Sequence, residues 1–458
     1  MNRFVPYPIL EAFTPAILST NTYLEDARFS GEAIPLLIAL ERPGGSISRY
    51  DTLVNTSNGM WLDRSKRYLE RLIKFLLWAQ GGSKVTIGGS GSLAAAMKAT
   101  YSPEGTRQFD YEFMTRIYGT PFEVISCGLD EVPDPRRSGK PIGRHLDGCR
   151  IGFDLGASDV KVSAVLDGQP VFSTEREWHP REQVDPDYHK NFIREMLKLA
   201  AAHLPRVDAI GGSSAGVIIN NQPRVASLFR GVPESTYPRV HSLFDELAAE
   251  FGVPLVVIND GEVSALAGAM SLEDNGVLGL ALGSSEAAGY VDRQGSLTDY
   301  LDELAFAPID YHPEAPRDEW SGDAGVGANY LSQQAVFRLA GRVGMNIPED
   351  LSLAGKLEYV QEFLEKGDEK AQQIWQTIGV YLGYSLAYYA EFYDFKHVLI
   401  LGRVTSGSGG AILLAQAEKV LREQFPGLAD KVKLHLPDEK TRRVGQSIAA
   451  ASLPNIER

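Results

Sequence analysis

Twice along this chain, two β-rich segments joined by a tight turn are followed by helices. The first pair comprises residues 151–153 and 160–165, and the second comprises 277–281 and 288–291. Short apolar runs predict further strands at 255–258 and 397–401, each followed by a helix. This repeated order predicts an α/β protein with two ribonuclease-H-like lobes around a cleft.

The first turn carries residues suited to a phosphate and a metal. The segment RIGFDLGASDVKVSAVLDG spans 150–168, and its first strand ends near Asp154. Asp154 could hold Mg²⁺ through water. Gly156 would let backbone amides approach a phosphate closely, and the Ser158 hydroxyl would add a donor. The alternative is a plain β-hairpin with a polar tip.

A second acidic motif follows the apolar strand at 255–258. The chain runs directly into Asn259 and Asp260, and a helix of small residues comes next. A carboxylate at the end of such a strand suits a general base that takes a proton from a hydroxyl. Asn and Asp also favour the N-caps of helices, so both residues could simply cap this helix. The spacing alone leaves the two interpretations even.

The predicted domain boundary is a linker rich in Pro, Gly and charge at 130–148. We expect an N-terminal α/β extension over 1–147, a first lobe over 148–270 and a second lobe over 271–458. A Gly/Ser turn in the extension, Gly88 to Ser92, precedes a predicted helix and could bind an anion. No Walker lysine follows, and a structural turn is the preferred interpretation.

Composition limits the classes of function. The 458 residues carry a formal charge of −14, which disfavours nucleic-acid binding. With only Cys127 and Cys149, neither a disulfide framework nor a cysteine zinc site is expected, and a reducing cytoplasm fits. No stretch is apolar and long enough for a membrane span. We expect a cytoplasmic protein without membrane or nucleic-acid partners.

Together these motifs resemble the ROK family (repressors, open reading frames and sugar kinases) of the actin/hexokinase-type ATPases, over about 150–453. FGVPLVVINDGEVSALAGA at 251–269 is similar to the family's GxPVxxxNDANxAALGE. LGLALGSSEAAGYVDRQGSL at 278–297 resembles its second phosphate loop, and LDELAFAPID at 301–310 resembles GExGHxxxD. WSGDAGVGANYLSQQAV at 320–336 has the spacing of CGxxGCLExYxS. HVLILGRVTSGSGGAILLAQAEKVL at 397–421 resembles the segment that encloses adenosine.

The resemblance implies ATP- and Mg²⁺-dependent phosphoryl transfer to the hydroxyl of a sugar, an amino sugar or a polyol. It makes Asp260 the base and Asn259 and Glu303 sugar ligands, and it places Asp154, Gly156 and Ser158 beside metal and phosphates. The second phosphate loop would be Gly283, Ser284 and Ser285, and the adenine pocket would be bordered by Gly402, Gly407, Gly409 and Gly410. The last helix, near 441–453, would cross back to the first lobe. Family members often pair, so a homodimer is expected by analogy.

The chain also departs from the family pattern. Val326 stands where a zinc-binding cysteine is expected, so no zinc site is predicted; His312 alone cannot make one. Phe306 and Ala328 replace a histidine and a glutamate that contact the sugar. Glu286 in the second phosphate loop would repel polyphosphate unless it points away or binds metal, and Asp159 adds an acid to the first loop. These departures motivate an alternative function, a non-catalytic sugar- or nucleotide-binding regulatory protein on the same fold.

Overall fold

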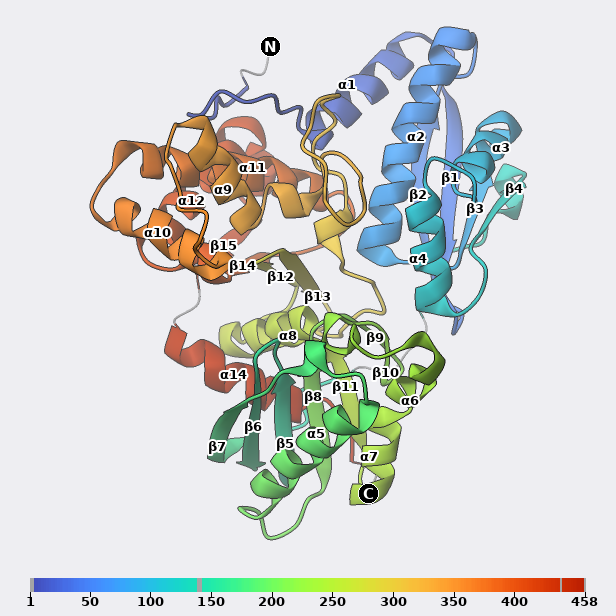
Figure 1. Ribbon diagram of the computed structural model, residues 1–458. Coiled ribbons are helices and arrows are strands. Elements are labelled where there is room, and N and C mark those ends of the chain that lie inside the picture. Colours follow the sequence, from blue (N-terminus) through green and yellow to red (C-terminus); the bar gives the residue numbers. More distant parts are fainter. Residues whose placement is uncertain (1–3, 138–141, 437–438, 457–458) are drawn as a thin grey trace. The chain divides into compact units, whose positions relative to one another are not determined.

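The computed structural model describes residues 4–137, 142–436 and 439–456. The chain divides into two compact units (Figure 1). The first unit comprises Met1–Gly139, Leu280–Ala288 and Asp299–Leu436, and the second comprises Lys140–Gly279, Gly289–Thr298 and Pro437–Arg458. The extension therefore belongs to the same compact unit as most of the C-terminal half. The domain boundaries expected from the sequence remain a prediction.

A five-stranded sheet of order β11-β8-β5-β6-β7 forms the centre of the second unit. Strands β5 (Cys149–Leu155) and β6 (Asp159–Leu166) form the predicted hairpin, and β7 (Gln169–Glu177) extends it antiparallel. Strands β8 (Ala209–Ser214) and β11 (Leu255–Asn259) run parallel to β5. Three antiparallel strands followed by two parallel ones give the ribonuclease-H-like order that the sequence predicts.

Helices cover both faces of this sheet. Apolar side chains that alternate along β5, such as Ile151 and Phe153, pack in one core with α5 (Pro186–Ala201) and α7 (Leu243–Phe251). On the other face, β-carbons at Gly152 and Gly211 would overlap the backbone of α14 (Glu439–Ala451). Only glycine allows this close approach. The prediction that the last helix returns to the first lobe is confirmed.

The remaining elements of the second unit are short, apart from α8 (Asp260–Leu272), which follows β11 directly. Strands β9 (Val217–Ile219) and β10 (Gln222–Val225) form a two-stranded ribbon, and α6 (Pro238–His241) precedes α7.

The extension forms a four-stranded sheet of order β2-β1-β3-β4 in the first unit. Its strands are β1 (Ile34–Glu41), β2 (Ile47–Val54), β3 (Lys84–Gly88) and β4 (Glu123–Cys127). Its helices are α1 (Ala16–Phe29), α2 (Gly59–Gln80), α3 (Gly91–Thr100) and α4 (Gln108–Tyr118). The predicted α/β character of this segment is therefore confirmed.

A second sheet, of order β13-β12-β14-β15, includes the second predicted hairpin. It consists of β12 (Val277–Leu282), β13 (Glu286–Val291), β14 (His397–Leu401) and β15 (Lys433–His435). The helices of this part are α9 (Gln333–Arg342), α10 (Leu353–Glu365), α11 (Glu369–Tyr389), α12 (Ser408–Gln424) and α13 (Pro426–Ala429). In the described residues, no helix has both the length and the apolar character needed to cross a membrane.

The N-terminal segment before α1 packs along α11. The Val5 amide donates to the Tyr384 hydroxyl at 2.9 Å, and the Phe4 and Tyr384 rings stack at 5.3 Å. Buried Glu11 accepts hydrogen bonds from Arg338 and, at 2.6 Å, from Tyr381. A buried carboxylate is stable only with such partners. These contacts fasten the start of the extension to the helices of the C-terminal half.

Candidate active site

Parallel pairing brings two acidic motifs of the second unit to one edge of the sheet. Asp154 of β5 and Ile258 of β11 both pair with Ser213 of β8, which lies between the two strands. The carboxyl ends of the three strands therefore coincide. Asp260 follows β11 directly as the first residue of α8. In open α/β sheets, ligands bind beyond the carboxyl ends of strands, so this edge is the candidate site.

Two neighbours hold the carboxylate of Asp154. The Ser213 hydroxyl donates to Oδ1, and Nζ of Lys161 lies 3.7 Å from Oδ2. Burial raises the pKa of Asp154, while the bond from Ser213 and the charge of Lys161 oppose this shift. Lys161 also lies 2.8 Å from Asp159, so the extra acid of the first loop is paired within the hairpin.

The predicted phosphate turn is held by local hydrogen bonds. The Gly156 amide donates to the Asp159 carbonyl at 2.9 Å, and the indole N–H of Trp178 donates to the Gly156 carbonyl at 2.8 Å. Ser158 is exposed, and its hydroxyl lies 3.3 Å from Oδ2 of Asp159. The turn is therefore a defined structure with an exposed hydroxyl at its tip.

Asn259 is the N-cap of α8. Its Oδ1 accepts from the Gly261 amide at 2.7 Å, its Nδ2 donates to the Gly216 carbonyl at 2.9 Å, and Glu262 completes a capping box. The capping interpretation of Asn259 is thus confirmed. Its oxygen thus accepts from two amides of the first turn, and its role as a sugar ligand remains a prediction.

Asp260 is a carboxylate with an altered acidity. Burial, and secondarily the charge of Asp154, raise its pKa to about 6, while the Gly261 amide, 3.0 Å from Oδ1, opposes the shift. A carboxyl group with a pKa near neutrality, at a ligand-binding edge, suits proton abstraction. Its role as the catalytic base remains a prediction.

The first unit holds the other predicted ligand groups. The loop between β12 and β13 exposes Ser284 and Ser285, and Gly283 accepts from the Gln333 amide at 2.9 Å. Gly402 follows β14 with φ +99°, and a β-carbon there would overlap the Leu282 carbonyl. Gly402 therefore lies beside the end of β12, next to the Gly283–Ser285 loop.

Glu286, which follows this loop, points into the interior of the unit. It is 3% exposed, and its Oε1 accepts from the Tyr389 hydroxyl at 3.2 Å. Burial raises its pKa to about 8, so the group is mostly protonated at neutral pH. The repulsion of polyphosphate that the sequence suggested is thereby avoided, since the side chain points away and is uncharged.

The glycines near the start of α12 are explained at least in part by packing. Side chains at Gly409 and Gly410 would overlap Trp375 and the Thr405 carbonyl, and Gly407 has φ +64°. The Ser408 amide donates to Glu365 at 2.7 Å, which lowers the pKa of that carboxyl. This helix start is therefore already capped by a carboxylate, and the adenine pocket remains a prediction.

Glu303 lies at the start of a short 3₁₀ helix, Leu304–Phe306. It is half-buried, and its amide donates to the carbonyl of Trp78 in α2 at 2.9 Å. The Phe306 ring packs on the Trp78 ring with centroids 4.6 Å apart. The segment that would supply a sugar ligand is thus placed by the extension.

Sequence reasoning missed Ser213 and Lys161, the two partners of Asp154. Both follow from pairing, because Ser213 lies opposite Asp154 on β8 and Lys161 opposite it on β6. A usable signal was the polar Ser213-Ser214 pair at the end of an apolar strand. Without the strand order, however, no contact with Asp154 could be assigned.

The described residues contain no group of three or more His, Cys, Asp or Glu side chains arranged to hold a metal ion. A single carboxylate such as Asp154 nevertheless fits Mg²⁺, which is commonly bound by one or two carboxylates together with substrate phosphates. The donor set at this edge is therefore compatible with a nucleotide-bound Mg²⁺.

No protein-family model and no curated protein matches the chain. Solved structures do. A ROK family glucokinase from Streptomyces griseus, solved with glucose and AMPPNP, is 20% identical, with a TM-score of 0.50 over 66% of this chain and 99% of that one. A ROK family transcriptional regulator, a homologue of the E. coli MLC protein, is 21% identical, with a TM-score of 0.51 over 67% and 79%.

A ROK hexokinase from Thermus thermophilus is similar as well, at 17% identity and a TM-score of 0.51 over 66% of this chain and 97% of that one. These structures include both kinases and a regulator, so the likeness does not by itself choose an activity. It does confirm the predicted architecture: this chain has the two-lobed α/β fold of ROK family sugar kinases and regulators.

Proposed function

We propose that the protein is an ATP-dependent kinase that phosphorylates a hydroxyl of a sugar, an amino sugar or a polyol. The observation that carries this proposal is the position of Asp260 at the carboxyl end of β11, with its pKa raised to about 6 beside Asp154. The shared fold with a glucokinase solved with glucose and AMPPNP supports it.

In this mechanism Asp260 accepts the proton of the acceptor hydroxyl as that oxygen approaches the γ-phosphorus of ATP. Asn259 and Glu303 would orient the sugar. Asp154 would hold Mg²⁺ through water, and Gly156, Ser158 and residues 283–285 would contact the phosphates. The metal would supply charge neutralisation on the transferred group. Glycines 402, 407, 409 and 410 would border the adenine.

The test of the base is Asp260→Asn, which preserves shape but cannot accept the proton. Turnover of ATP plus a panel of glucose, mannose, N-acetylglucosamine and N-acetylmannosamine should fall about 10³-fold. Asp245→Asn, at an exposed position on α7, is the matched control and should keep full activity. A variant at Asp260 that retained most of the activity would contradict the assignment.

One observation favours the non-catalytic alternative. Lys161 lies 3.7 Å from Asp154 and would compete with Mg²⁺ for its carboxylate. Calorimetric titration with ATP and Mg²⁺, with Asp154→Ala as control, separates the two functions. Binding that the variant loses supports the kinase, whereas binding of nucleotide and sugar without turnover across the panel supports a regulatory protein.

A further inference from the structure

The loop at 316–325 in the first unit is held in one conformation by its own hydrogen bonds. Buried Asp318 accepts from the Trp320 amide at 3.2 Å and from the Ser321 amide at 2.7 Å. Arg317 donates to the Gly322 carbonyl at 2.9 Å across the loop. These bonds close a tight turn whose tip is Trp320.

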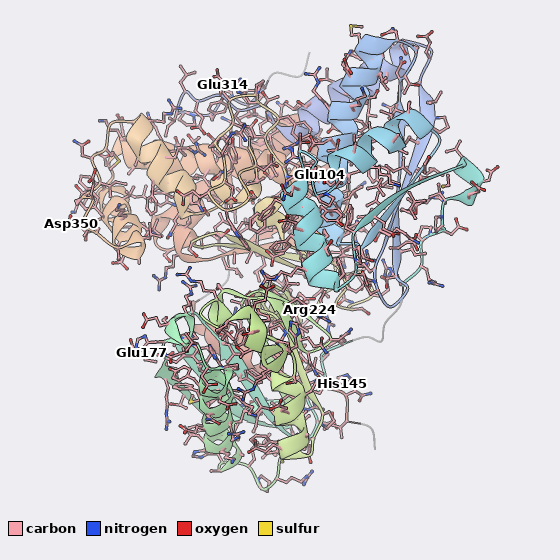
Figure 2. The ribbon with its side chains drawn as sticks, turned by 45° about the vertical axis from the view of Figure 1, so that its right-hand side comes forward. Glu104, His145, Glu177, Arg224, Glu314 and Asp350 are labelled. Atoms are coloured by element: carbon pink, nitrogen blue, oxygen red, sulfur yellow. The ribbon has the colours of Figure 1, made fainter. Side chains whose placement is uncertain are left out.

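The extension fixes this loop through a buried ion network. Asp323, at the end of the turn, lies 3.1 Å from Arg71, 3.4 Å from Lys74 and 2.7 Å from Arg107. Lys74 is fully buried and also lies 2.6 Å from Asp110. All three cations thus come from the extension. In Figure 2, the label of Glu104 marks the connection between α3 and α4, which ends at Arg107.

Loss of one partner from such a network leaves a buried charge uncompensated, which is strongly destabilising. The network therefore gives the loop a defined position relative to α2 and α4. The proton transfer proposed for Asp260 does not involve this ion network.

Trp320 itself rests on an aromatic cluster. Its ring meets those of Phe109, Phe113 and Phe306 edge to face, with centroids 5.7, 5.5 and 5.2 Å away. Phe109 and Phe113 come from α4, whereas Phe306 lies three residues after Glu303. Despite these contacts, Trp320 remains 59% exposed. The cluster therefore supports the Trp320 side chain while leaving more than half of it exposed to water.

We propose that Trp320 is a stacking platform for the ring of the acceptor, and that the extension forms part of the acceptor site by fixing this platform. The inference rests on the proposed function, because Glu303 is linked to the cluster through Trp78 and Phe306. A rigid aromatic face with nearby polar groups is typical of small-molecule sites. The exposed carboxylate of Glu319 disfavours a phosphate-bearing ring, so the occupant is an uncharged polyhydroxylated ring.

The experiment is calorimetric titration of the full chain with glucose, mannose, N-acetylglucosamine and N-acetylmannosamine in turn. Trp320→Ala should weaken binding of the sugar that binds best roughly tenfold, and Trp320→Phe should weaken it no more than about threefold. Phe29→Ala is the matched control, because Phe29 is an aromatic residue of the extension that is 90% exposed. It should bind sugar as the wild type does.

A second variant tests the role of the network as a positioning device. Asp323→Asn should weaken sugar binding in the same direction, and combining it with Trp320→Ala should add little, since both act through the same ring. Where turnover is measurable, both variants should raise KM and leave kcat within about twofold. A merely structural role of Asp323 would lower the melting temperature without this coupling.

The outcomes separate the two proposals. Sugar binding that weakens in Trp320→Ala, without any phosphorylation of the panel, would refute the kinase and support the platform. Equal binding by Trp320→Ala and wild type would overturn the platform, as would the absence of binding of all four sugars to the wild type. Additive effects of the two substitutions would overturn the role of the network.

Discussion

At the scale of single residues, two carboxyl groups both have raised pKa values, but the consequences differ. Asp260 lies at the candidate site with a pKa of about 6, whereas Glu286 is buried behind the Gly283–Ser285 loop with a pKa of about 8. Burial disfavours the charged form of both. If Asp260 is the base proposed above, the first shift tunes its acidity for proton transfer, whereas the second keeps a buried group neutral.

For Asp260, the raised pKa predicts the acid limb of the pH profile. A general base acts in its ionised form, so kcat/KM should be constant well above pH 6 and fall tenfold per unit well below it. The measurement is kcat/KM against pH for the sugar that is turned over, with ATP saturating. A profile flat down to pH 5 would contradict the assignment.

For Glu286, the raised pKa predicts a pH-dependent stability. The folded protein keeps this proton between pH 4.5, the ordinary pKa of the group, and about pH 8. The contribution of protonated Glu286 to the free energy of unfolding is therefore present at low pH and is lost as the pH rises through 8. Glu286→Gln mimics the protonated form. In urea titrations the variant should match wild type at pH 5 and exceed its unfolding free energy by roughly 4 kcal/mol at pH 9. A difference that does not change with pH would refute a neutral Glu286.

At the scale of elements, the contact between α14 and the central sheet depends on two glycines. Gly152 of β5 and Gly211 of β8 leave no room for a β-carbon beneath the helix backbone. The helix α14 therefore packs directly on β5, the strand that carries Asp154.

Substitution at this contact should therefore be costly. Gly152→Ala should lower the unfolding free energy by about 2 kcal/mol or more, because backbone cannot move aside as a flexible side chain can. Gly341→Ala is the control, since a β-carbon at that position of α9 meets no atom within 4 Å. It should be neutral or stabilise the protein by about 0.5 kcal/mol. Equal midpoints for both variants in urea would contradict the close packing.

At the scale of the whole molecule, the extension and much of the C-terminal half share one compact unit. Glu11 is bound by Arg338 and Tyr381, and Asp323 by three cations of the extension. These interactions bury charged groups that would be unpaired if either part were alone. The extension is therefore expected to be necessary for folding of the C-terminal half.

A chain that starts at residue 140 should consequently fail to fold cooperatively. Without the extension, apolar surface of α11 and α9 and the carboxylate of Asp323 lose their cover. Increased binding of a hydrophobic dye and loss of a sharp thermal transition, relative to the full chain, would be the expected results. A truncated chain that melts cooperatively at the temperature of the full chain would show that the extension is an independent domain.

Local sequence patterns correctly predict the local structure of this protein. The hairpin of β5 and β6, the strand–helix junction at Asn259 and Asp260, and the α/β character of the extension follow from periodicity and turn residues. The family resemblance also indicated the fold that the solved structures confirm. These features depend on residues that are neighbours in sequence, so a single sequence is enough to predict them.

Contacts between side chains of different elements, in contrast, are seen only in the folded structure. The partners of Asp154 come from neighbouring strands, the direction of Glu286 depends on Tyr389, and the network at Asp323 joins residues about 250 positions apart, as in the pair with Arg71. Periodicity specifies which face of an element is buried, but not against which other element it packs. The role of the extension could therefore not be predicted, because it lies in contacts that no local pattern encodes.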